Sequence, residues 1–403
     1  MEKVKLGEIA KQIRGVSYNG DVSTDIETNE YLPILRSNNI EEGSLNFEDL
    51  VYVPKELVTE NQLLQNGDIL ITASTGSIKV LGKNGSFDSD LKCSFGAFCK
   101  VVRATEKVEK NYLKHFFQTN YYRRTIQNIT NGANINNIRN EHIDDLEIPL
   151  PSLEKQKEIA AGLDKADEIR RLNQELIEKY NQLTQSLFLD MFGDPVKNEK
   201  GWEKVELSKL TNLITDGKHG NCNDEENSGY YFISAKDIFD NKINYSNTRQ
   251  IPKSEFEEVD RRTNLQKGDL VMVNTGATIG KMAIIKDIPE TRRTTFQKSV
   301  AVIKPKIELI NVQFLKYVFE LRLDSFSGKG SGSAIKNLLL SEMRRFLIIL
   351  PPLSLQNEFA SRVSAIEAQK QLAENALAKS EELFQSLLQD CFRHCERSEA
   401  TSQ

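Results

Sequence analysis

The sequence repeats itself at an offset of about 200 residues, and this duplication constrains the fold more than any other feature. Matching blocks occur in the same order in both halves of the chain. They are NGDILITASTG at 66–76 with KGDLVMVNTG at 267–276, GANINNI at 132–138 with GSAIKNL at 332–338, IPLPSLEKQKEIA at 148–160 with IILPPLSLQNEFA at 348–360, and SLFLDMF at 186–192 with SLLQDCF at 386–392. Blocks repeated in one order indicate a tandem duplication, so we expect two similar halves.

Each copy contains a mixed segment followed by a long helical one. The mixed segment alternates short apolar runs such as DILITA and DLVMV with turn residues, which predicts strands joined by turns. After PLPSL or LPPLS, apolar residues recur at steps of three and four, and neither Pro nor Gly interrupts 163–192 or 353–392. We therefore expect two helices of about 38 residues, each roughly 57 Å long, that pair through their apolar stripes.

Composition fits a globular chain with more than one domain. The 403 residues are 39% hydrophobic and 28% charged, and a single core rarely extends over such a length. The start, MEKVKLGEIAKQIRG, lacks the apolar core of a signal peptide, and no apolar run approaches a membrane span. The 5 cysteines are odd in number and lack framework spacing. We expect reduced thiols, a cytoplasmic location and no membrane partner.

The stretch VNTGATIGKM at 273–282 raises the question of a phosphate-binding loop. That motif needs four residues between its glycines and a Ser or Thr after its Lys. Here three residues separate Gly276 from Gly280, and Met282 follows Lys281. Aligning the Thr-Gly pairs of the two copies also places Val80 opposite Gly280. We therefore interpret the stretch as a turn between strands, and a nucleotide hydrolase using Lys281 as the weaker alternative.

Other catalytic or metal-binding patterns are equally weak. The only Pro-Pro pair, Pro351-Pro352, lacks the flanking residues of an adenine methyltransferase motif, and the 4 histidines are scattered. Cys391, His394 and Cys395 offer three metal ligands near the C-terminus without a fourth. We therefore expect no catalytic and no metal site.

Several of these stretches resemble one known family, the specificity (S) subunits of type I restriction–modification enzymes. The similar stretches are VKLGEIAK, GDILITASTGSI with GDLVMVNTGATIGK, LPSLEKQKEIA with LPPLSLQNEFA, and LFLDMFGDPVKNEKGWEKVEL. The resemblance covers essentially residues 4–392, and CFRHCERSEATSQ at the C-terminus departs from it.

The resemblance implies an α+β fold in which two tandem-duplicated target-recognition domains are joined by two long, antiparallel, coiled-coil-like helices with pseudo-two-fold symmetry. The expected segments follow in chain order. They are target-recognition domain 1 at 1–150, the central helix at 151–193, target-recognition domain 2 at 194–350, the C-terminal helix at 351–392 and a disordered tail at 393–403.

The same resemblance implies a function and partners. Each recognition domain would read one half of a split, asymmetric sequence in double-stranded DNA, and the chain itself would catalyse nothing. Two methyltransferase (modification) subunits carrying S-adenosylmethionine would dock on the helices, and restriction subunits using ATP and Mg²⁺ can join. Candidate docking residues are Leu163, Ile169, Leu172, Leu176, Leu183, Val363, Ile366, Leu377 and Leu387.

Candidate DNA contacts are polar residues beyond the Gly-Asp strands, in the Gly/Asn-rich stretches and on earlier loops. Arg and Lys read guanine, Asn and Gln read adenine, and Ser and Thr serve either base. The candidates are Thr75, Ser77, Lys79, Lys83, Asn134, Asn136, Arg139, Lys218, Lys236, Thr275, Thr278, Lys281, Arg292, Lys329, Ser331 and Lys336. The net charge of −5 permits DNA binding because residues 201–350 carry an excess of basic residues. The alternative is that these loops only face solvent, in a helical adaptor that reads no DNA.

Overall fold

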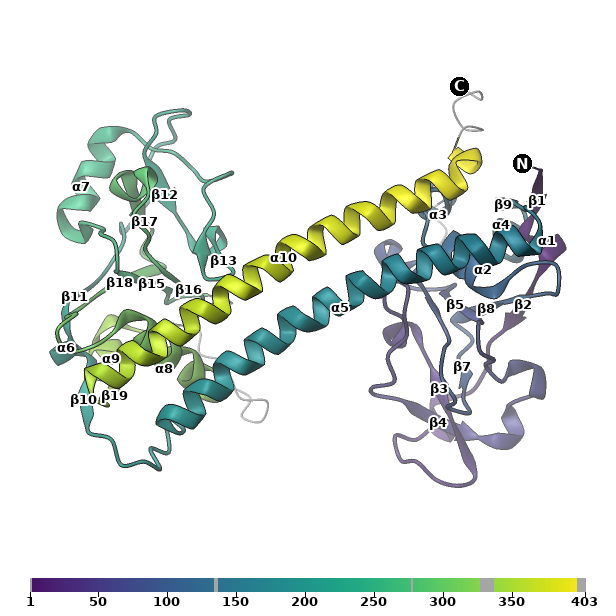
Figure 1. Cartoon of the computed structure of the whole chain (residues 1–403), viewed down its shortest axis with the longest axis horizontal. Helices are drawn as coiled ribbons and strands as arrows, with labels where there is room; N and C mark the ends of the chain where they lie inside the picture. Colours follow the sequence, from purple (N-terminus) through teal and green to yellow (C-terminus); the bar gives the residue numbers. More distant parts are fainter. Residues whose placement is uncertain (1, 134–136, 277, 327–336, 397–403) are drawn as a thin grey trace. The chain divides into compact units, whose positions relative to one another are not determined.

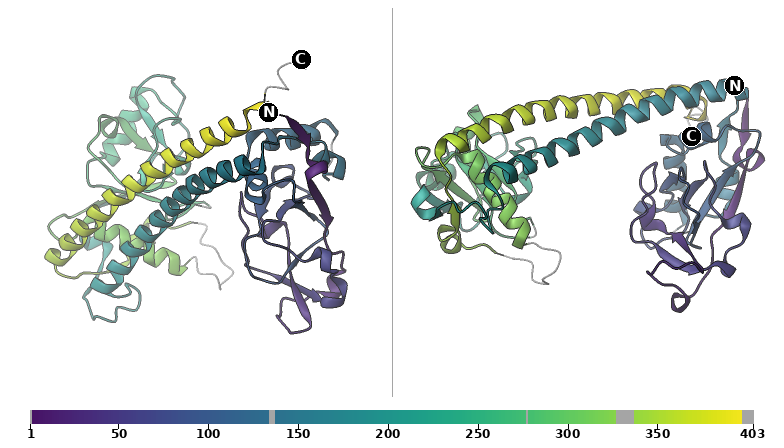
Figure 2. Two further views of the ribbon diagram at one scale, coloured as in Figure 1. Left: turned by 45° about the vertical axis from the view of Figure 1, so that its right-hand side comes forward. Right: turned by 60° about the horizontal axis from the view of Figure 1, so that its bottom comes forward.

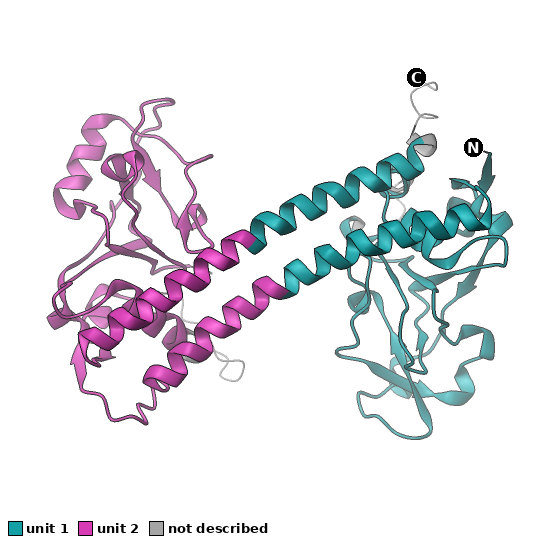
Figure 3. Cartoon of the chain, viewed as in Figure 1, with its two compact units in different colours: residues 1–175, 373–403 teal, residues 176–372 magenta. Residues whose placement is uncertain are grey.

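The computed structural model describes residues 2–133, 137–276, 278–326 and 337–396 (Figure 1). The chain forms two compact units, of which unit 1 contains residues 1–175 and 373–403 and unit 2 contains residues 176–372 (Figure 3). The long helices α5 (Leu153–Phe192) and α10 (Leu353–Glu396) each contribute one part to unit 1 and the other to unit 2. Unit 1 is therefore assembled from two separate segments of the chain, whereas unit 2 is one continuous segment.

The part of unit 1 that precedes α5 consists of short strands and short helices. In chain order these are β1 (Lys3–Lys5), α1 (Leu6–Ile9), β2 (Ala10–Arg14), β3 (Tyr31–Leu35), β4 (Val51–Pro54), β5 (Ile69–Thr72), β6 (Asn84–Ser86), β7 (Ser94–Phe95), β8 (Cys99–Ala104), α2 (Lys110–Phe116), α3 (Asn120–Ala133), α4 (Asn140–Asp144) and β9 (Glu147–Pro149). The main sheet has the order β2-β8-β5-β6, beside the sheets β4-β3-β7 and β1-β9.

Unit 2 repeats this arrangement. Its elements are β10 (Lys204–Glu206), α6 (Leu207–Leu210), β11 (Thr211–Asp216), β12 (Tyr231–Ile233), β13 (Ile238–Phe239), β14 (Lys242–Ile243), α7 (Lys253–Thr263), β15 (Leu270–Val273), β16 (Met282–Ile284), β17 (Thr294–Phe296), β18 (Val300–Pro305), α8 (Val312–Phe326), α9 (Leu340–Arg344) and β19 (Leu347–Ile349). The sheet β11-β18-β15-β16 matches the main sheet of unit 1, and β10-β19 matches β1-β9. The expected duplication and the α+β class are confirmed.

The Gly-Asp pairs that precede β5 and β15 fix each main sheet by a buried carboxylate. Asp68 is 1% exposed, and Arg103 on β8 donates to its two oxygens at 2.8 and 2.7 Å. In unit 2, Lys304 donates to Asp269 in the same way. Each carboxylate also accepts the N–H of the residue three positions upstream, since Gln65 N–H donates to Asp68 and Gln266 N–H donates to Asp269, each at 2.8 Å. The shared motif is therefore structural.

In unit 1, α2 packs against the first half of α5 and the last turns of α10. The buried side chains come from all three helices, among them Leu113, Phe116, Leu163, Leu388 and Phe392. The ring of Phe392 lies 5.0 Å from that of Tyr112 and 5.9 Å from that of Phe116. The start of α5 thus lies beside the end of α10, so the helices run antiparallel in this unit (Figure 2).

In unit 2, the end of α5 packs against the start of α10 and against α8. The ring of Phe314 on α8 lies 5.6 Å from Phe188 and 4.8 Å from Phe192, and both α5 rings contact Phe359 of α10. Aromatic pairs at such distances stabilise the fold by more than the burial of their apolar area alone. The repeated SLFLDMF and SLLQDCF motifs are therefore helix ends whose apolar side chains complete the cores of unit 2 and unit 1, respectively.

The last helix is longer than the sequence indicated. We expected it to end at Phe392 and to be followed by a disordered tail at 393–403, but α10 continues to Glu396. Residues 397–403 lie outside the described part of the chain.

Candidate nucleic-acid interface

Several loops of unit 1 meet at one end of the main sheet, where β2 and β5 finish and β6 and β8 begin. We call this region the loop end of unit 1. Backbone hydrogen bonds join the loops to one another. They run from Val16 N–H to Phe95 C=O at 2.8 Å, from Gly96 N–H to Leu35 C=O at 2.9 Å, from Ala73 N–H to Phe98 C=O at 2.9 Å, and from Ile138 N–H to Ala73 C=O at 2.7 Å. The loops therefore form one connected framework.

Unit 2 has the same framework at the end of its main sheet where β11 and β15 finish and β16 and β18 begin. The equivalent bonds run from Lys218 N–H to Phe296 C=O at 2.7 Å, from Gln297 N–H to Ile233 C=O at 2.9 Å, from Asn274 N–H to Ser299 C=O at 3.0 Å, and from Leu338 N–H to Asn274 C=O at 2.8 Å. We call this the loop end of unit 2. The duplication has kept the backbone of this region while its side chains changed.

A glycine permits the closest approach within each framework. A Cβ atom on Gly15 would lie 2.2 Å from the carbonyl oxygen of Gly96, and one on Gly217 would lie 1.9 Å from that of Phe296. Any larger residue would push the loops apart, because backbone atoms cannot move aside cheaply. The loop ends therefore depend on these glycines.

The structure corrects our alignment of the two Gly-Lys turns. The N–H of Gly82 donates to Thr72 and that of Gly280 to Val273, each at 2.9 Å, and both glycines have positive φ. Gly280 therefore corresponds to Gly82, and the pairing of Gly280 with Val80 was wrong.

Lys281 likewise corresponds to Lys83, whose carbonyl oxygen accepts the N–H of Thr72 at 2.8 Å. The lysine is thus common to both copies. The turn joins two antiparallel strands, β15 and β16, whereas a phosphate-binding loop opens a helix. This strand–turn–strand topology argues against nucleotide hydrolysis. The absence of Gly280 and Lys281 from the first copy cannot be used as an argument, because Gly82 and Lys83 are their counterparts.

Most of the described candidates in unit 1 gather at its loop end. Thr75, Ser77, Lys79 and Lys83 lie in the loop from β5 to β6, and Lys79 and Ser77 are exposed. Arg139 follows Ile138, whose N–H is bonded to the end of β5. Two candidates, Asn134 and Asn136, lie outside the described residues.

In unit 2, Thr275, Thr278 and Lys281 lie in the loop from β15 to β16, and Lys236 lies in the 3-10 turn Ala235–Asp237 after β12. Arg292 does not join them. It precedes β17, whose other end leads into the turn at Gln297, so Arg292 lies roughly 10 Å or more away along the strand. Three candidates, Lys329, Ser331 and Lys336, lie outside the described residues.

Lys218 reaches the loop end of unit 2 but already has an anionic partner. Its Nζ lies 2.8 Å from Glu258 of α7. The hydrogen bond to Glu258 raises the pKa of Lys218 above its usual value. A DNA phosphate would have to compete with this carboxylate, so Lys218 is a weaker candidate than Lys281.

Residue-type reasoning missed the turn that leads from β7 to β8, Gly96–Phe98, and its duplicate, Gln297–Ser299. Both turns lie at the centre of the loop-end frameworks. Gln297 and Lys298 follow a strand in the pattern used for the other candidates and could have been found that way. Phe98 could not, because an isolated Phe in a sequence is normally assigned to the core.

The candidate docking residues on the helices fall into two groups. Leu163 and Val363 are buried in the cores of their units, and Ile366, Leu377 and Leu387 are half-buried. Ile169, Leu172, Leu176 and Leu183 on α5 are 50%, 49%, 39% and 50% exposed. The prediction that a single apolar stripe on α5 packs in the helix pair was therefore wrong for these four residues.

The inner contact between the helices in unit 1 is partly polar. Asn173 Nδ2 lies 3.5 Å from Ser380 Oγ, and the guanidinium of Arg170 lies 5.1 Å from the ring centre of Phe384. Because polar residues occupy the inner face here, the exposed leucines of α5 remain available to another molecule.

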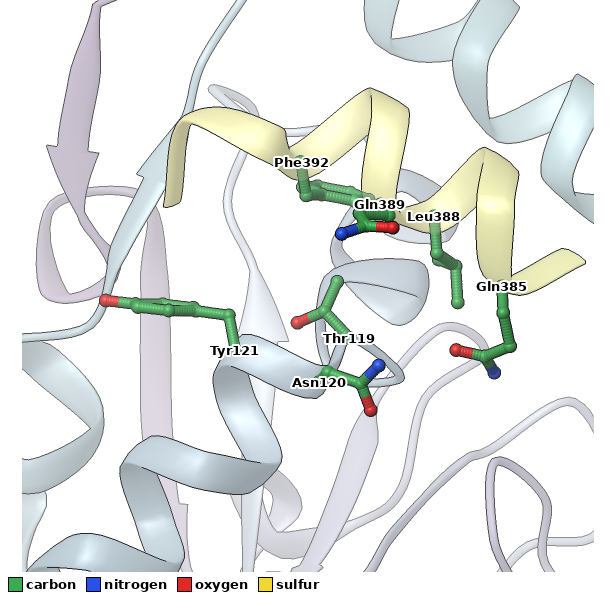
Figure 4. Close-up of a pocket in the computed structure, with 7 residues that line it drawn as sticks. All are labelled: Thr119, Asn120, Tyr121, Gln385, Leu388, Gln389 and Phe392. Atoms are coloured by element: carbon green, nitrogen blue, oxygen red, sulfur yellow. The ribbon is translucent and has the colours of Figure 1, made fainter. Parts of the chain in front are cut away.

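A small hollow in unit 1 lies between the start of α3 and the end of α10 (Figure 4). Its lining residues are Thr119, Asn120, Tyr121, Gln385, Leu388, Gln389 and Phe392. It has room for about one water molecule, so a nucleoside cofactor would not fit.

Among the described residues, no helix is long and apolar enough to cross a membrane.

Comparison of the sequence with models of known protein families identifies the family to which the chain belongs. The family model described as the type I restriction modification DNA specificity domain matches residues 1–182 and again residues 199–382. The chain belongs to this family. The resemblance drawn from the sequence motifs is thereby confirmed, and the two matches coincide with the two copies of the repeat.

Relatives in the family match over most of their length. The StySPI specificity subunit of Salmonella potsdam is 30% identical over 94% of this chain and 86% of the relative. The EcoKI specificity subunit of Escherichia coli strain K12 is 28% identical over the same shares. The crystal structure of the type I S subunit from M. genitalium has the same fold, with a TM-score of 0.57 at 15% identity over 97% and 96% of the two chains. A chain from a solved type I R-M system gives 0.55 at 17% identity over 97% of both.

Proposed function

We propose that this chain recognises a two-part DNA sequence for a type I restriction–modification complex, with one half-site read at each loop end. The observation that carries the proposal is the repeated backbone framework with divergent side chains. Exposed Ser77 and Lys79 in unit 1, and Lys236 and Lys281 in unit 2, supply donors suited to phosphates and base edges. Different side chains on one scaffold suit an asymmetric site.

The exposed leucines of α5 support a docking role in the same complex. Ile169 and Leu172 belong to the part of α5 in unit 1, and Leu176 and Leu183 to the part in unit 2. Apolar side chains of this size that are about half exposed on one helix are typical of a surface that another protein covers. We assign these residues to binding of the methyltransferase subunits, of which the proposed complex has two.

The chain contributes recognition, and its partners contribute chemistry. In the proposed complex, the methyltransferase subunits carry S-adenosylmethionine, and the restriction subunits use ATP and Mg²⁺. The Gly-Lys turn at Lys281 is part of a β-hairpin, and the Asp of each Gly-Asp pair is occupied by a basic partner on the neighbouring strand. These features serve the scaffold and the DNA surface.

A binding experiment separates this function from that of a helical adaptor. The chain is co-expressed with its methyltransferase subunits, and the complex is mixed with a pool of random DNA duplexes at moderate salt. Repeated gel-shift selection should enrich duplexes that share two short sequences at a fixed separation. An adaptor that reads no DNA would yield no enriched sequence.

A further inference from the structure

Phe98 is the most exposed large apolar side chain of unit 1 among the described residues, at 70%. It lies in the turn between β7 and β8, while its neighbours Phe95 and Cys99 are fully buried. A single exposed apolar residue needs no explanation by itself. Phe98 differs because it stands at the centre of the loop end of unit 1, among polar residues that are proposed to face DNA.

The backbone holds Phe98 rigidly in this position. Its carbonyl oxygen accepts the N–H groups of both Ala73 and Ser74, at 2.9 and 3.0 Å. Across the turn, the N–H of Cys99 donates to Gly96 at 2.9 Å. The aromatic ring is therefore presented on a fixed backbone, and little entropy would be lost if it bound a ligand.

The duplicate turn in unit 2 has the counterparts of two of these backbone bonds, from Asn274 N–H to Ser299 C=O and from Val300 N–H to Gln297 C=O, and different side chains. Ser299 takes the place of Phe98, because its carbonyl oxygen accepts the N–H of Asn274 at 3.0 Å. Gln297 and Lys298 precede it, and Lys298 is exposed. The turn thus carries an apolar side chain in one copy and polar ones in the other, as two readers of different half-sites require.

We propose that the turn from β7 to β8 is a specificity element and that Phe98 reads the methyl group of a thymine in the first half-site. Among base edges in the major groove, only thymine presents an apolar group, and Phe is one of the side chains that contact it. The inference rests on the proposed DNA-binding function and adds to it one residue and one base.

The test uses the assembled complex of the full chain with its methyltransferase subunits. Once the two half-sites are known, duplexes are made in which each thymine of one half-site is replaced singly by uracil, which lacks only the methyl group. With the natural chain, one replacement in the first half-site should weaken binding roughly fourfold, the effect of one buried methyl group. Phe98→Ala should bind that duplex and the unmodified one equally.

A control variant is Ile26→Ala, since Ile26 is 66% exposed on the loop between β2 and β3. This variant should keep the uracil effect. Neither variant should alter reading of the second half-site. The inference is overturned if the first half-site contains no thymine on either strand, or if Phe98→Ala retains the uracil effect. Both results leave the proposed function standing, whereas a natural complex without any sequence preference contradicts that function itself.

Discussion

His115 Nε2 lies 2.8 Å from Oδ1 of Asp164, and this contact fastens α2 of the first recognition domain to the long helix α5. His115 is fully buried, and Lys114 donates to the same carboxylate oxygen at 2.9 Å. Burial alone would raise the pKa of Asp164, but the hydrogen bonds with His115 and Lys114 outweigh it and lower the pKa from 3.8 to about 2. The ionised carboxylate therefore stabilises unit 1.

Asp164→Asn should lower the free energy of unfolding by roughly 1 to 2 kcal/mol near neutral pH, after allowance for partial exposure of the carboxylate. Because the pKa is lower in the folded protein, this stabilisation is present above pH 3.8 and is lost as the pH falls towards about 2. Urea unfolding of the full chain at several pH values measures it. Glu168→Gln, at an exposed position on the same helix, is the control and should have little effect.

Loss of the buried carboxylate of the Gly-Asp turn should be more damaging. Asp68→Ala removes the carboxylate that neutralises Arg103, whose side chain is only 17% exposed, and leaves the guanidinium only the carbonyl oxygens of Asn61 and Leu63. The expected cost is about 3 kcal/mol or more in unfolding free energy. Thermal unfolding of this variant is compared with that of Asp90→Ala, at an exposed position. Equal melting temperatures would show that the ion pair does not hold the sheet.

Replacing the exposed leucines of α5 should weaken assembly with the partner subunits without disturbing the fold of the chain. Leu172→Asp combined with Leu183→Asp should leave the circular dichroism spectrum unchanged, since both side chains are about half exposed. Binding of the methyltransferase subunits should weaken by two orders of magnitude, because burying an unpaired carboxylate costs about 3 kcal/mol or more. Size-exclusion chromatography with the co-expressed partner reports assembly. Lys165→Asp, on an exposed position of α5, is the control, and an intact complex with both leucines replaced would contradict the docking assignment.

Lys281 and Arg292 should differ in their effect on DNA binding, although both are exposed basic residues of unit 2. Lys281→Ala should weaken binding severalfold for every sequence and lower the salt slope by about 1, as expected for one lost phosphate contact. Arg292→Ala should change neither quantity, because Arg292 lies at the other end of β17 from the loop end. Fluorescence anisotropy at several salt concentrations distinguishes the two variants, and a larger effect of Arg292 would refute the placement.

The duplication, the long helices and the fold class could be predicted because they depend on repeated blocks and on helix periodicity. Asn134, Asn136, Lys329, Ser331 and Lys336 remain predictions, since they lie outside the described residues.

Local register could not be predicted where loop lengths differ. The loop from β5 to β6 (73–83) has 3 residues more than the loop from β15 to β16 (274–281), so the equivalence of Lys83 and Lys281 emerges only when backbone hydrogen bonds are compared.

Periodicity also could not separate the two faces of α5. Leu163 and Leu172 both fall on steps of three and four, yet Leu163 is 1% exposed and Leu172 is 49% exposed. Which face a helix buries depends on its neighbours. The polar residues Asn173 and Ser380 lie at the contact between α5 and α10, where apolar patterning predicts hydrophobic residues. Phe98, in the turn from β7 to β8, was not recognised as a surface residue because an isolated Phe is normally assigned to the core.

Genome-wide mapping of methylated adenines, in a strain that expresses this chain with its methyltransferase subunits, tests recognition of a two-part DNA site most directly. The two loop ends predict one methylated motif composed of two different short half-sites with a constant spacer between them, and this methylation should disappear when the chain is omitted. A single uninterrupted motif, or methylation that does not depend on the chain, would contradict this account.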